Sequence, residues 1–280
     1  MKIYRLATIA SIAAIMASCS SGKKADDAST DDGIATAYTV ETVTYKDSAI
    51  IGDSKILAEC TIGHLKFDNA DNPLGDNIDK WIRHMLMDSA DSIAVGQPLA
   101  RHIVDGLISE NEGDIRDWEE AFGEESEISM SYDLDYSVKP EVVAPGYVTM
   151  VFNSYVYTGG AHGSSATIGR TFAAATGEEM DYDNMFEAEA ADAVNELVKK
   201  GLMEQYFKVK TEKEFENALM DYDGELAFPA NAPYFTEEGV CFLYQQYEIA
   251  CYAAGMPQCV IPYDALRPYF TKAALSLLED

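Results

Sequence analysis

The chain has 280 residues, 48% of them hydrophobic, which is enough for an ordinary buried core in one large or two small domains. Its 48 acidic residues outnumber its 20 basic ones and give a formal net charge of -28. This charge repels the phosphate backbone, so nucleic acid is excluded as a partner. It suits a cationic partner, or simply a solvated surface that keeps the protein soluble.

The first 19 residues have the pattern of a bacterial export signal. Lys2 and Arg5 precede an apolar run over residues 6–17, which is shorter than the roughly 20 residues of a membrane span. The run ends in Met-Ala-Ser-Cys, which resembles a lipobox with Met in the place usually held by Leu. We expect cleavage before Cys19 and acylation of that cysteine, with a plain secretory signal cleaved elsewhere as the alternative. The protein is then expected in the bacterial cell envelope, lipid-anchored in the outer membrane, with its domain outside the cytoplasm.

Residues 20–34 are small, polar and charged without periodicity, which predicts a flexible tether. Export to an oxidising compartment allows the four remaining cysteines to pair. Cys251 and Cys259 flank a Gly- and Pro-containing segment and are the first pair to test for a disulfide. Cys60 shares an apolar strand face with its neighbours, so a buried free thiol is at least as plausible there as a bridge.

The rest of the chain predicts clusters of strands and helices. In order, these are a hairpin over residues 36–47 and 54–67 with a turn at Gly52–Asp53, helices over 76–87 and from Pro98 past Leu107, strands over 127–138, 146–158 and 165–175, helices over 188–200 and 212–220, and a strand, loop, strand and helical turn over 239–270. Because strands and helices do not alternate regularly, the pattern favours an α+β fold over a parallel wound one. We expect an antiparallel sheet or sheets with helices packed on one face, and two sequential subdomains.

Three motifs in the second half of the chain carry a resemblance to a known family. They are YVYTGGAHG at 155–163, RTFAAATGEEMDYDNMF at 170–186, and YQQYEIACYAAGMPQCVIPYDALRPYF at 244–270. Together they resemble the uncharacterised RsiV-like domain, which ends a lysozyme-sensing anti-sigma factor and also occurs beside a peptidoglycan deacetylase and in exported lipoproteins. The resemblance implies an RsiV-like domain over 141–280, preceded by an α+β module over 35–140. The anti-sigma factor has a cytoplasmic segment and a membrane-spanning helix where this chain has a lipoprotein-type signal, so sigma-factor control is not implied.

His162 lies in a glycine-rich loop that joins two predicted strands. Catalysis would need an orienting acid, and none is within a few positions, although Ser164 and Ser165 follow and a remote Asp remains an alternative. The other histidines are scattered, so no metal site and no cofactor are expected. The favoured interpretation is that Gly159 and Gly160 adopt positive φ while His162 hydrogen-bonds the backbone and holds the turn.

Tyrosine is the second signal of function. Tyr155 and Tyr157 flank the glycine loop, and Tyr247 and Tyr252 lie in the C-terminal motif. Such side chains suit protein or glycan recognition, and equally suit a half-buried sheet face. With Gly159, Gly160 and His162, they are the candidate ligand-binding residues.

The sequence therefore predicts a non-enzymatic, lipid-anchored binding module. The resemblance makes lysozyme, to be bound or blocked, the first partner to consider, and the negative charge suits such a cationic protein. Peptidoglycan or another glycan is the alternative, and a hydrolase that uses His162 is the third.

The proposed anchor is testable by one substitution. Because a Cys19→Ala chain has no thiol to acylate, we expect it to leave the membrane fraction and to lose incorporation of labelled fatty acid. Cell fractionation and metabolic labelling measure both effects, and labelling that persists in Cys19→Ala would reject the anchor.

Overall fold

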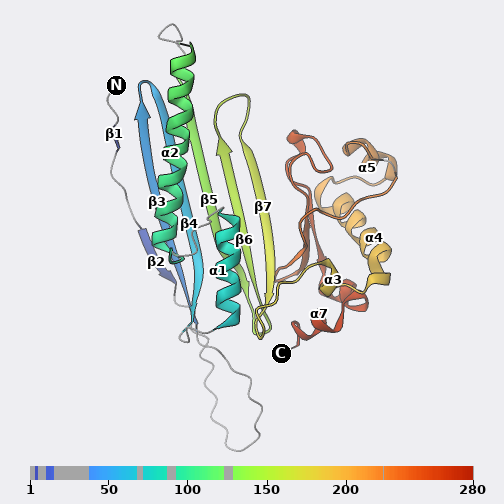
Figure 1. Ribbon diagram of the computed structural model, residues 1–280. Coiled ribbons are helices and arrows are strands. Elements are labelled where there is room, and N and C mark those ends of the chain that lie inside the picture. The colour runs from blue at the N-terminus through green and yellow to red at the C-terminus, as the bar shows by residue number, and fades with distance from the viewer. Residues whose placement is uncertain are drawn as a thin grey trace, which may run out of the picture.

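The structure is a computed structural model that describes residues 4–5, 11–15, 38–67, 72–86, 93–122, 129–222 and 224–279. It has the predicted α+β fold (Figure 1). Cys19 and the segment 20–34 lie outside the described residues, so the predictions for them stay predictions. Within the described part of the chain, no helix is both long and apolar enough to span a membrane.

The first part of the chain forms one large sheet and two helices. Its elements are β1 (Tyr4–Arg5), β2 (Ser11–Ile15), β3 (Tyr38–Ile51), β4 (Ser54–Phe67), α1 (Pro73–Met85), α2 (Gln97–Phe122), β5 (Ser131–Val143), β6 (Tyr147–Tyr157) and β7 (Ser164–Ala173). The sheet has the strand order β1-β3-β4-β5-β6-β7, and β2 also pairs with β3. β1 and β2 belong to the expected export signal, so cleavage before Cys19 would leave β3 as the first strand of the sheet. The predicted hairpin is confirmed as β3–β4, whose turn has Gly52 at a φ of 57°.

The sheet is mixed, whereas the sequence analysis expected an antiparallel one. β4 and β5 pair in parallel, and the other neighbours pair antiparallel. The parallel pair arises because α1 and α2 form a crossover between these two strands, and a crossover lets the chain re-enter a sheet in the same direction.

Helices α1 and α2 cover one face of the large sheet, in front of the strands in Figure 1. The cap of α1 is Asn72, whose Oδ1 accepts hydrogen bonds from the amides of Leu74 and Gly75, so the helix begins before the predicted start at residue 76. The helix begins earlier because Pro73 is tolerated in its first turn. Pro98 has the same role in α2, as predicted.

The main hydrophobic core lies between these helices and the sheet. The buried side chains alternate along β4, where Ile56, Ala58, Cys60 and Ile62 face the helices. Trp81 of α1 packs edge-on against Phe172 of β7, with ring centroids 6.1 Å apart. Burial of these apolar surfaces is the main driving force that holds helices on the sheet.

The second part of the chain forms smaller elements beside β7. They are α3 (Tyr182–Met185), η1 (Ala188–Ala190), α4 (Ala191–Gly201), η2 (Leu202–Tyr206), α5 (Glu212–Ala218), β8 (Tyr234–Phe235), β9 (Gly239–Leu243), η3 (Tyr252–Ala254), β10 (Gln258–Pro262), α6 (Tyr263–Leu266), η4 (Arg267–Tyr269) and α7 (Lys272–Ser276). β10, β9 and β8 form a small antiparallel sheet, and a second buried cluster centres on Phe215, Phe235 and Phe242. The predicted helices over 188–200 and 212–220 correspond to η1–α4 and α5.

The expected boundary between residues 140 and 141 falls inside β5. β6 and β7, from the second half of the chain, complete the same sheet that β3 begins. The spacing of motifs along the sequence does not reveal which strands share a sheet, because neighbouring strands are set by pairing between distant segments.

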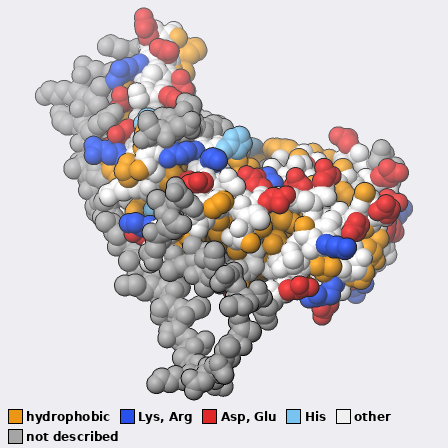
Figure 2. Space-filling model, turned by 60° about the horizontal axis from the view of Figure 1, so that its bottom comes forward, with side chains coloured by type: hydrophobic (Ala, Val, Ile, Leu, Met, Phe, Trp, Pro, Cys, Tyr) orange, Lys and Arg blue, Asp and Glu red, His pale blue; other side chains and the backbone are white. Residues whose placement is uncertain are grey.

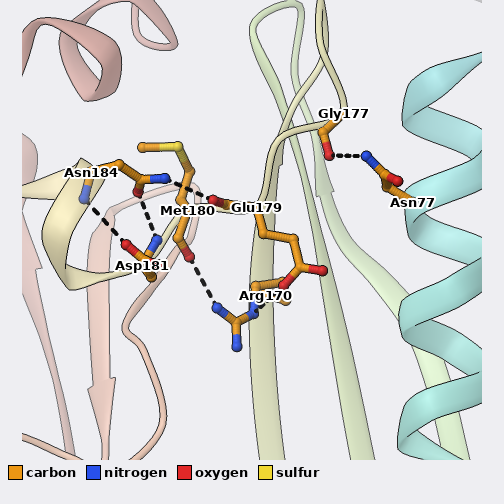
Figure 3. A network of polar contacts seen from close by, with 7 residues as sticks. All are labelled: Asn77, Arg170, Gly177, Glu179, Met180, Asp181 and Asn184. Carbon is orange, nitrogen blue, oxygen red and sulfur yellow. Dashed lines mark hydrogen bonds and ion pairs between the residues drawn. The ribbon is translucent and has the colours of Figure 1, made fainter.

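The RTFAAATGEEMDYDNMF motif has a structural role at the junction of the two parts (Figure 3). Arg170 of β7 donates from Nη1 to the carbonyl oxygen of Met180 at 3.3 Å, and its Nε lies 3.4 Å from the Glu179 carboxylate. Asp181 and Asn184 cap each other's backbone amides in a capping box that starts α3. The motif thus fixes the direction in which the chain leaves the large sheet.

The turn after β7 also contacts α1. Asn77 of α1 donates from Nδ2 to the Gly177 carbonyl oxygen at 2.9 Å. Gly177 has a φ of 71°, and a Cβ at this position would lie 2.5 Å from the Pro73 carbonyl oxygen. Glycine is therefore required there for both backbone conformation and close approach.

A buried hydroxyl joins the large sheet to β8. Thr171 Oγ1 lies 2.9 Å from Thr149 Oγ1 and accepts the backbone amide of Phe235 at 2.8 Å. Both threonines are fully buried. The Phe235 amide therefore depends on this one side chain for its hydrogen bond.

Thr171→Val should destabilise the protein by about 1–3 kcal/mol, because it leaves a buried amide without an acceptor while keeping the side-chain shape. Thr167→Val, on the same strand, is the matched control, since the Thr167 hydroxyl makes an exposed hydrogen bond to Asn153 Oδ1. Urea unfolding of both variants measures the difference, and equal losses would contradict the role given to Thr171.

Candidate functional site

The candidate site lies on the face of the large sheet opposite α1 and α2. Arg101 of α2 lies over the Tyr45 ring, 5.7 Å from its centroid, so the next residue, Lys46, projects from the other face. Register then places one residue of each following strand beside Lys46. We call this set the cross-strand row; it consists of Lys46, Glu59, Asp135, Tyr155 and Ser165, from β3 to β7 in order.

The row combines an exposed aromatic ring with carboxylates. The Tyr155 side chain is 40% exposed, and its direct cross-strand neighbour is Asp135. Asp133 lies opposite Tyr157 one step further along the same two strands. Directly opposite residues have their Cβ atoms about 5 Å apart, so each tyrosine has a carboxylate within side-chain reach.

The charges of the row are not balanced. Lys46 Nζ lies 2.7 Å from Glu59 Oε2, and this hydrogen bond raises the pKa of Lys46. The pKa of Asp135 is raised, first by partial burial and then by the negative charges of Glu59 and Asp133. A cation brought by a ligand would relieve this repulsion, so the row favours a positively charged partner group.

Aromatic side chains from two distant motifs meet at the β7 end of the row. The His162 and Tyr252 rings stack with centroids 3.6 Å apart and an angle of 18° between planes, and Tyr247 lies 5.9 Å from Tyr252. The Tyr155 ring lies over Gly163, where a Cβ would come within 2.5 Å of it. We call Tyr155, His162, Tyr247 and Tyr252 the aromatic cluster.

The carbonyl oxygen of Gly163 holds two members of the aromatic cluster. It accepts the Tyr252 hydroxyl at 2.8 Å, and His162 Nδ1 lies 3.0 Å from it. Because a carbonyl only accepts, Nδ1 is the donor in this contact. This agrees with the prediction that His162 bonds the backbone.

The glycine loop adopts the backbone conformation predicted for it. Gly159 and Gly160 have φ values of 100° and 84°. Tyr157 folds back over the loop and donates its hydroxyl to the Gly160 carbonyl oxygen at 3.1 Å. Tyr157 therefore stabilises the loop, while Tyr155 is the more exposed ring.

The loop that carries Tyr247 is fixed on both sides. Gln246 Oε1 accepts the Ser165 amide at 2.9 Å, and the Glu248 carboxylate accepts the amides of Gln245 and Ala230 at 2.7 and 2.6 Å. Between them Tyr247 has a φ of 66° and is 54% exposed. A bulky residue in this left-handed region is strained, and such strain is commonly found where a side chain is presented for function.

The arrangement suits binding better than catalysis. His162 contacts a backbone carbonyl and an aromatic ring, and neither is an acid that could orient it as a base. In the described parts of the chain, no three His, Cys, Asp or Glu side chains are grouped so that they could hold a metal ion. The site as described offers ring faces, a hydroxyl and carboxylates for recognition.

Cys251 and Cys259, the first pair to test for a disulfide, are both free thiols in this structure. Cys259 faces the second core from β10, with its Sγ 3.5 Å from the Val198 carbonyl oxygen, and Cys251 is exposed. The alternation of β10 turns Cys259 inward and so separates the two thiols. Cys60 is buried and free, in agreement with the thiol prediction.

Sequence reasoning missed the carboxylates of the site. Alternation over residues 127–138 indicates that Asp133 and Asp135 share a solvated strand face. It does not indicate that the neighbouring strand places tyrosines beside them, because register between strands depends on tertiary pairing. Gln245 and Gln246 were also missed, since glutamine side chains that cap a strand edge leave no spacing signal.

A family model described as "protein of unknown function (DUF3298)" matches residues 183–264. The chain contains a DUF3298 domain. The match covers the end of the second motif and most of the C-terminal motif, and therefore includes Tyr247 and Tyr252 of the aromatic cluster. No match is found among curated proteins.

Two crystal structures of DUF3298 family proteins have a similar fold. A member from Bacteroides fragilis is 20% identical, with a TM-score of 0.67, and the match covers 86% of this chain and 96% of that one. A protein from Pseudomonas aeruginosa is 17% identical, with a TM-score of 0.52, and the match covers 85% of this chain and 96% of that one. The similarity therefore extends over the large sheet as well as over the DUF3298 domain.

Tyr247→Asn tests whether the loop stores strain. Asn tolerates the left-handed region, which costs other residues about 1–2 kcal/mol, so we expect stability to stay equal or rise by up to about 1 kcal/mol. Tyr252→Asn, a position without positive φ, is the control and should lose stability with its stacking and hydrogen bond. Thermal unfolding compares the two, and a loss at Tyr247 as large as at Tyr252 would show that its ring is a structural contact instead.

Proposed function

We propose that the protein is a non-enzymatic binding module of the bacterial cell envelope, anchored by lipid at Cys19. Its contact surface is the cross-strand row together with the aromatic cluster. The observation that carries this proposal is the pairing of exposed Tyr155 with Asp135 on the face of the sheet opposite α1 and α2, in the same aromatic cluster as the exposed ring of Tyr247.

The primary partner that we propose is a cationic protein such as lysozyme. A guanidinium group stacks on a tyrosine ring and pairs with a carboxylate, and the row offers both on neighbouring strands. The net charge of -28 adds long-range attraction that speeds encounter with a cation. The resemblance to the RsiV-like domain independently suggests lysozyme as the target.

Overall charge does not by itself locate the contact. Figure 2 shows acidic side chains scattered over the C-terminal part of the molecule and mixed with hydrophobic ones. The row is distinguished by its arrangement, in which carboxylates adjoin exposed rings.

Peptidoglycan is the second candidate ligand. The aromatic cluster favours it, because sugar rings can stack on aromatic faces without a charged partner. Such faces are offered by Tyr155, His162, Tyr247 and Tyr252. A hydrolase that uses His162 is the third alternative; it would need a remote Asp to orient the imidazole.

Calorimetry with a cationic lysozyme tests the primary proposal. We expect binding at 0.05 M salt that weakens clearly beyond about 0.15 M, where charges are screened over roughly 8 Å. Asp135→Asn should weaken binding about tenfold, or about 1.4 kcal/mol, while Asp117→Asn on the exposed surface of α2 should leave it unchanged. Tyr155→Ala should also weaken binding.

The outcomes separate the candidates. Absence of heat at low salt would remove lysozyme as the partner. Binding of peptidoglycan fragments that ignores salt and is lost in Tyr155→Ala would instead support the glycan alternative. Equal effects of Asp135→Asn and Asp117→Asn would move the contact away from the cross-strand row.

A further inference from the structure

A cavity of about 690 Å³ lies on the opposite side of the sheet from the cross-strand row. It is formed by one face of α1, by the start of α2 and by the adjoining ends of β3 and β4. Cavities of about 300–1,000 Å³ are the usual size of sites for small organic molecules. We call it the helix-start cavity.

The walls of the helix-start cavity differ in character. Val43, Leu65, Phe67 and Val95 provide apolar surface, and the apolar part of the lining is the larger one. Asp76 and Asp79 of α1, three residues apart, add carboxylates on one helix face. A ligand that fills this space must therefore combine a hydrocarbon part with a polar or charged group.

The charged groups of the lining favour a cation. Among the described residues of the lining, the carboxylates are Glu41, Asp76 and Asp79, and the permanent cations are Lys66 and Arg83. Lys66 Nζ is already paired with Glu41 Oε1 at 3.3 Å. On α1, the carboxylates of Asp76 and Asp79 outnumber the one guanidinium of Arg83, so an added positive charge would bring the described part of the lining closer to neutral.

His64 does not supply that positive charge. Burial lowers its pKa below the usual value, although the charge of Glu41 opposes this. Its Nδ1 is buried without a hydrogen-bond partner, and its ring packs on Gly96, where a Cβ would lie 3.0 Å from Cε1. The neutral ring forms part of the wall and adds no cation to the cavity.

Asp79 is held in an unfavourable environment. Burial is the largest cause that raises its pKa, to about 6; Asp76 adds to the rise, and Arg83 offsets it only in part. The pKa of Asp79 in the folded protein lies above its ordinary value of 3.8, so the ionised carboxylate lowers the free energy of unfolding at neutral pH. This loss of stability disappears as the pH falls from about 6 towards 3.8, where the carboxyl group becomes protonated. A carboxylate that costs stability inside a cavity is typical of a site kept for binding.

We propose that the helix-start cavity binds a primary amine on a hydrocarbon stem. The ammonium group donates to Asp79 and Asp76, and the stem lies against Val43, Leu65 and Val95. An ammonium has three N–H donors and no acceptor, which matches a wall of carboxylate acceptors. An anion would meet three carboxylates, and a neutral molecule would leave the desolvated charge of Asp79 uncompensated.

The proposal can be tested on the full-length protein with three probes of equal length. At pH 7.5 we expect hexylamine to bind at one site, at least tenfold tighter than hexan-1-ol, and hexanoate not to bind. Ligand-observed NMR or calorimetry measures these affinities. Hexanol or hexanoate binding as tightly as hexylamine would overturn the proposal.

Substitutions in the cavity wall test whether hexylamine binds at the helix-start cavity. Asp79→Asn should weaken hexylamine about tenfold, Asp76→Asn less, and Asp117→Asn on α2 not at all. Asp79→Asn should fold at least as stably as the parent at pH 7.5, so its loss of binding cannot be ascribed to unfolding. Unchanged affinity in Asp79→Asn would refute the site.

A second arm compares a free amine with a lysine side chain. Hexylamine and Nα-acetyl-lysine methylamide present the same ammonium on a similar stem. Binding of both would indicate a peptide lysine as the natural ligand, and binding of hexylamine alone would indicate a free amine. Lysozyme binding should persist in Asp79→Asn, because the cross-strand row lies on the other face of the sheet.

Discussion

The structure depends on how the outer edge of β7 is closed. A strand edge exposes unpaired amide and carbonyl groups, and these must find partners if the edge is buried. Gln245 supplies such partners from a side chain: its Oε1 accepts the Thr167 amide at 3.2 Å and its Nε2 donates to the Thr167 carbonyl oxygen at 2.7 Å. The amide group of one glutamine thus pairs with β7 as a neighbouring strand would.

The rest of that edge is closed by other segments of the C-terminal part. Gln246 Oε1 accepts a hydrogen bond from the Ser165 amide, and Thr171 Oγ1 accepts one from the Phe235 amide of β8. Further along, the Met180 amide donates to the Thr171 carbonyl oxygen, and the Ala173 amide donates to Glu178. Each contact satisfies a polar group and at the same time positions a loop, so the large sheet and the second core are joined by one continuous set of hydrogen bonds.

This closure also creates the candidate site. Because Gln245 and Gln246 bond to β7, the next residue, Tyr247, is placed beside the β6–β7 hairpin, and Tyr252 can stack on His162. The aromatic cluster therefore exists only when the two parts of the chain are docked. On the same face of the sheet, Val151 of β6 packs against Tyr234 of β8 and Leu243 of β9, whereas Tyr155 remains exposed.

Much of the fold could be predicted because its signals are local. Alternation identified β3 to β7, helical spacing identified α1, α2 and α4, and the glycine pair predicted the positive φ values of the β6–β7 loop. The start of α1 was placed too late because its cap, Asn72, precedes the apolar pattern by several residues, and a cap acts through backbone amides that a pattern does not reveal.

The candidate site was only half predictable, for a different reason. Its tyrosines and histidine were found because they belong to two distinctive motifs. Their carboxylate neighbours were not, because Asp135 meets Tyr155 only through pairing between β5 and β6. Glu59 joins them through the parallel β4–β5 pair, which no local pattern predicts.

The geometry of the row limits the kind of group that it can recognise. Neighbouring strands are about 4.8 Å apart, so Glu59, Asp135 and Tyr155 span roughly 10 Å across three strands. A single charged group therefore contacts only part of the row at one time. Lys46 already neutralises Glu59 from the far side, at 2.7 Å. The charge left for a ligand is therefore concentrated at Asp135 and Asp133, directly beside the tyrosines, where cation and ring contacts can be made together.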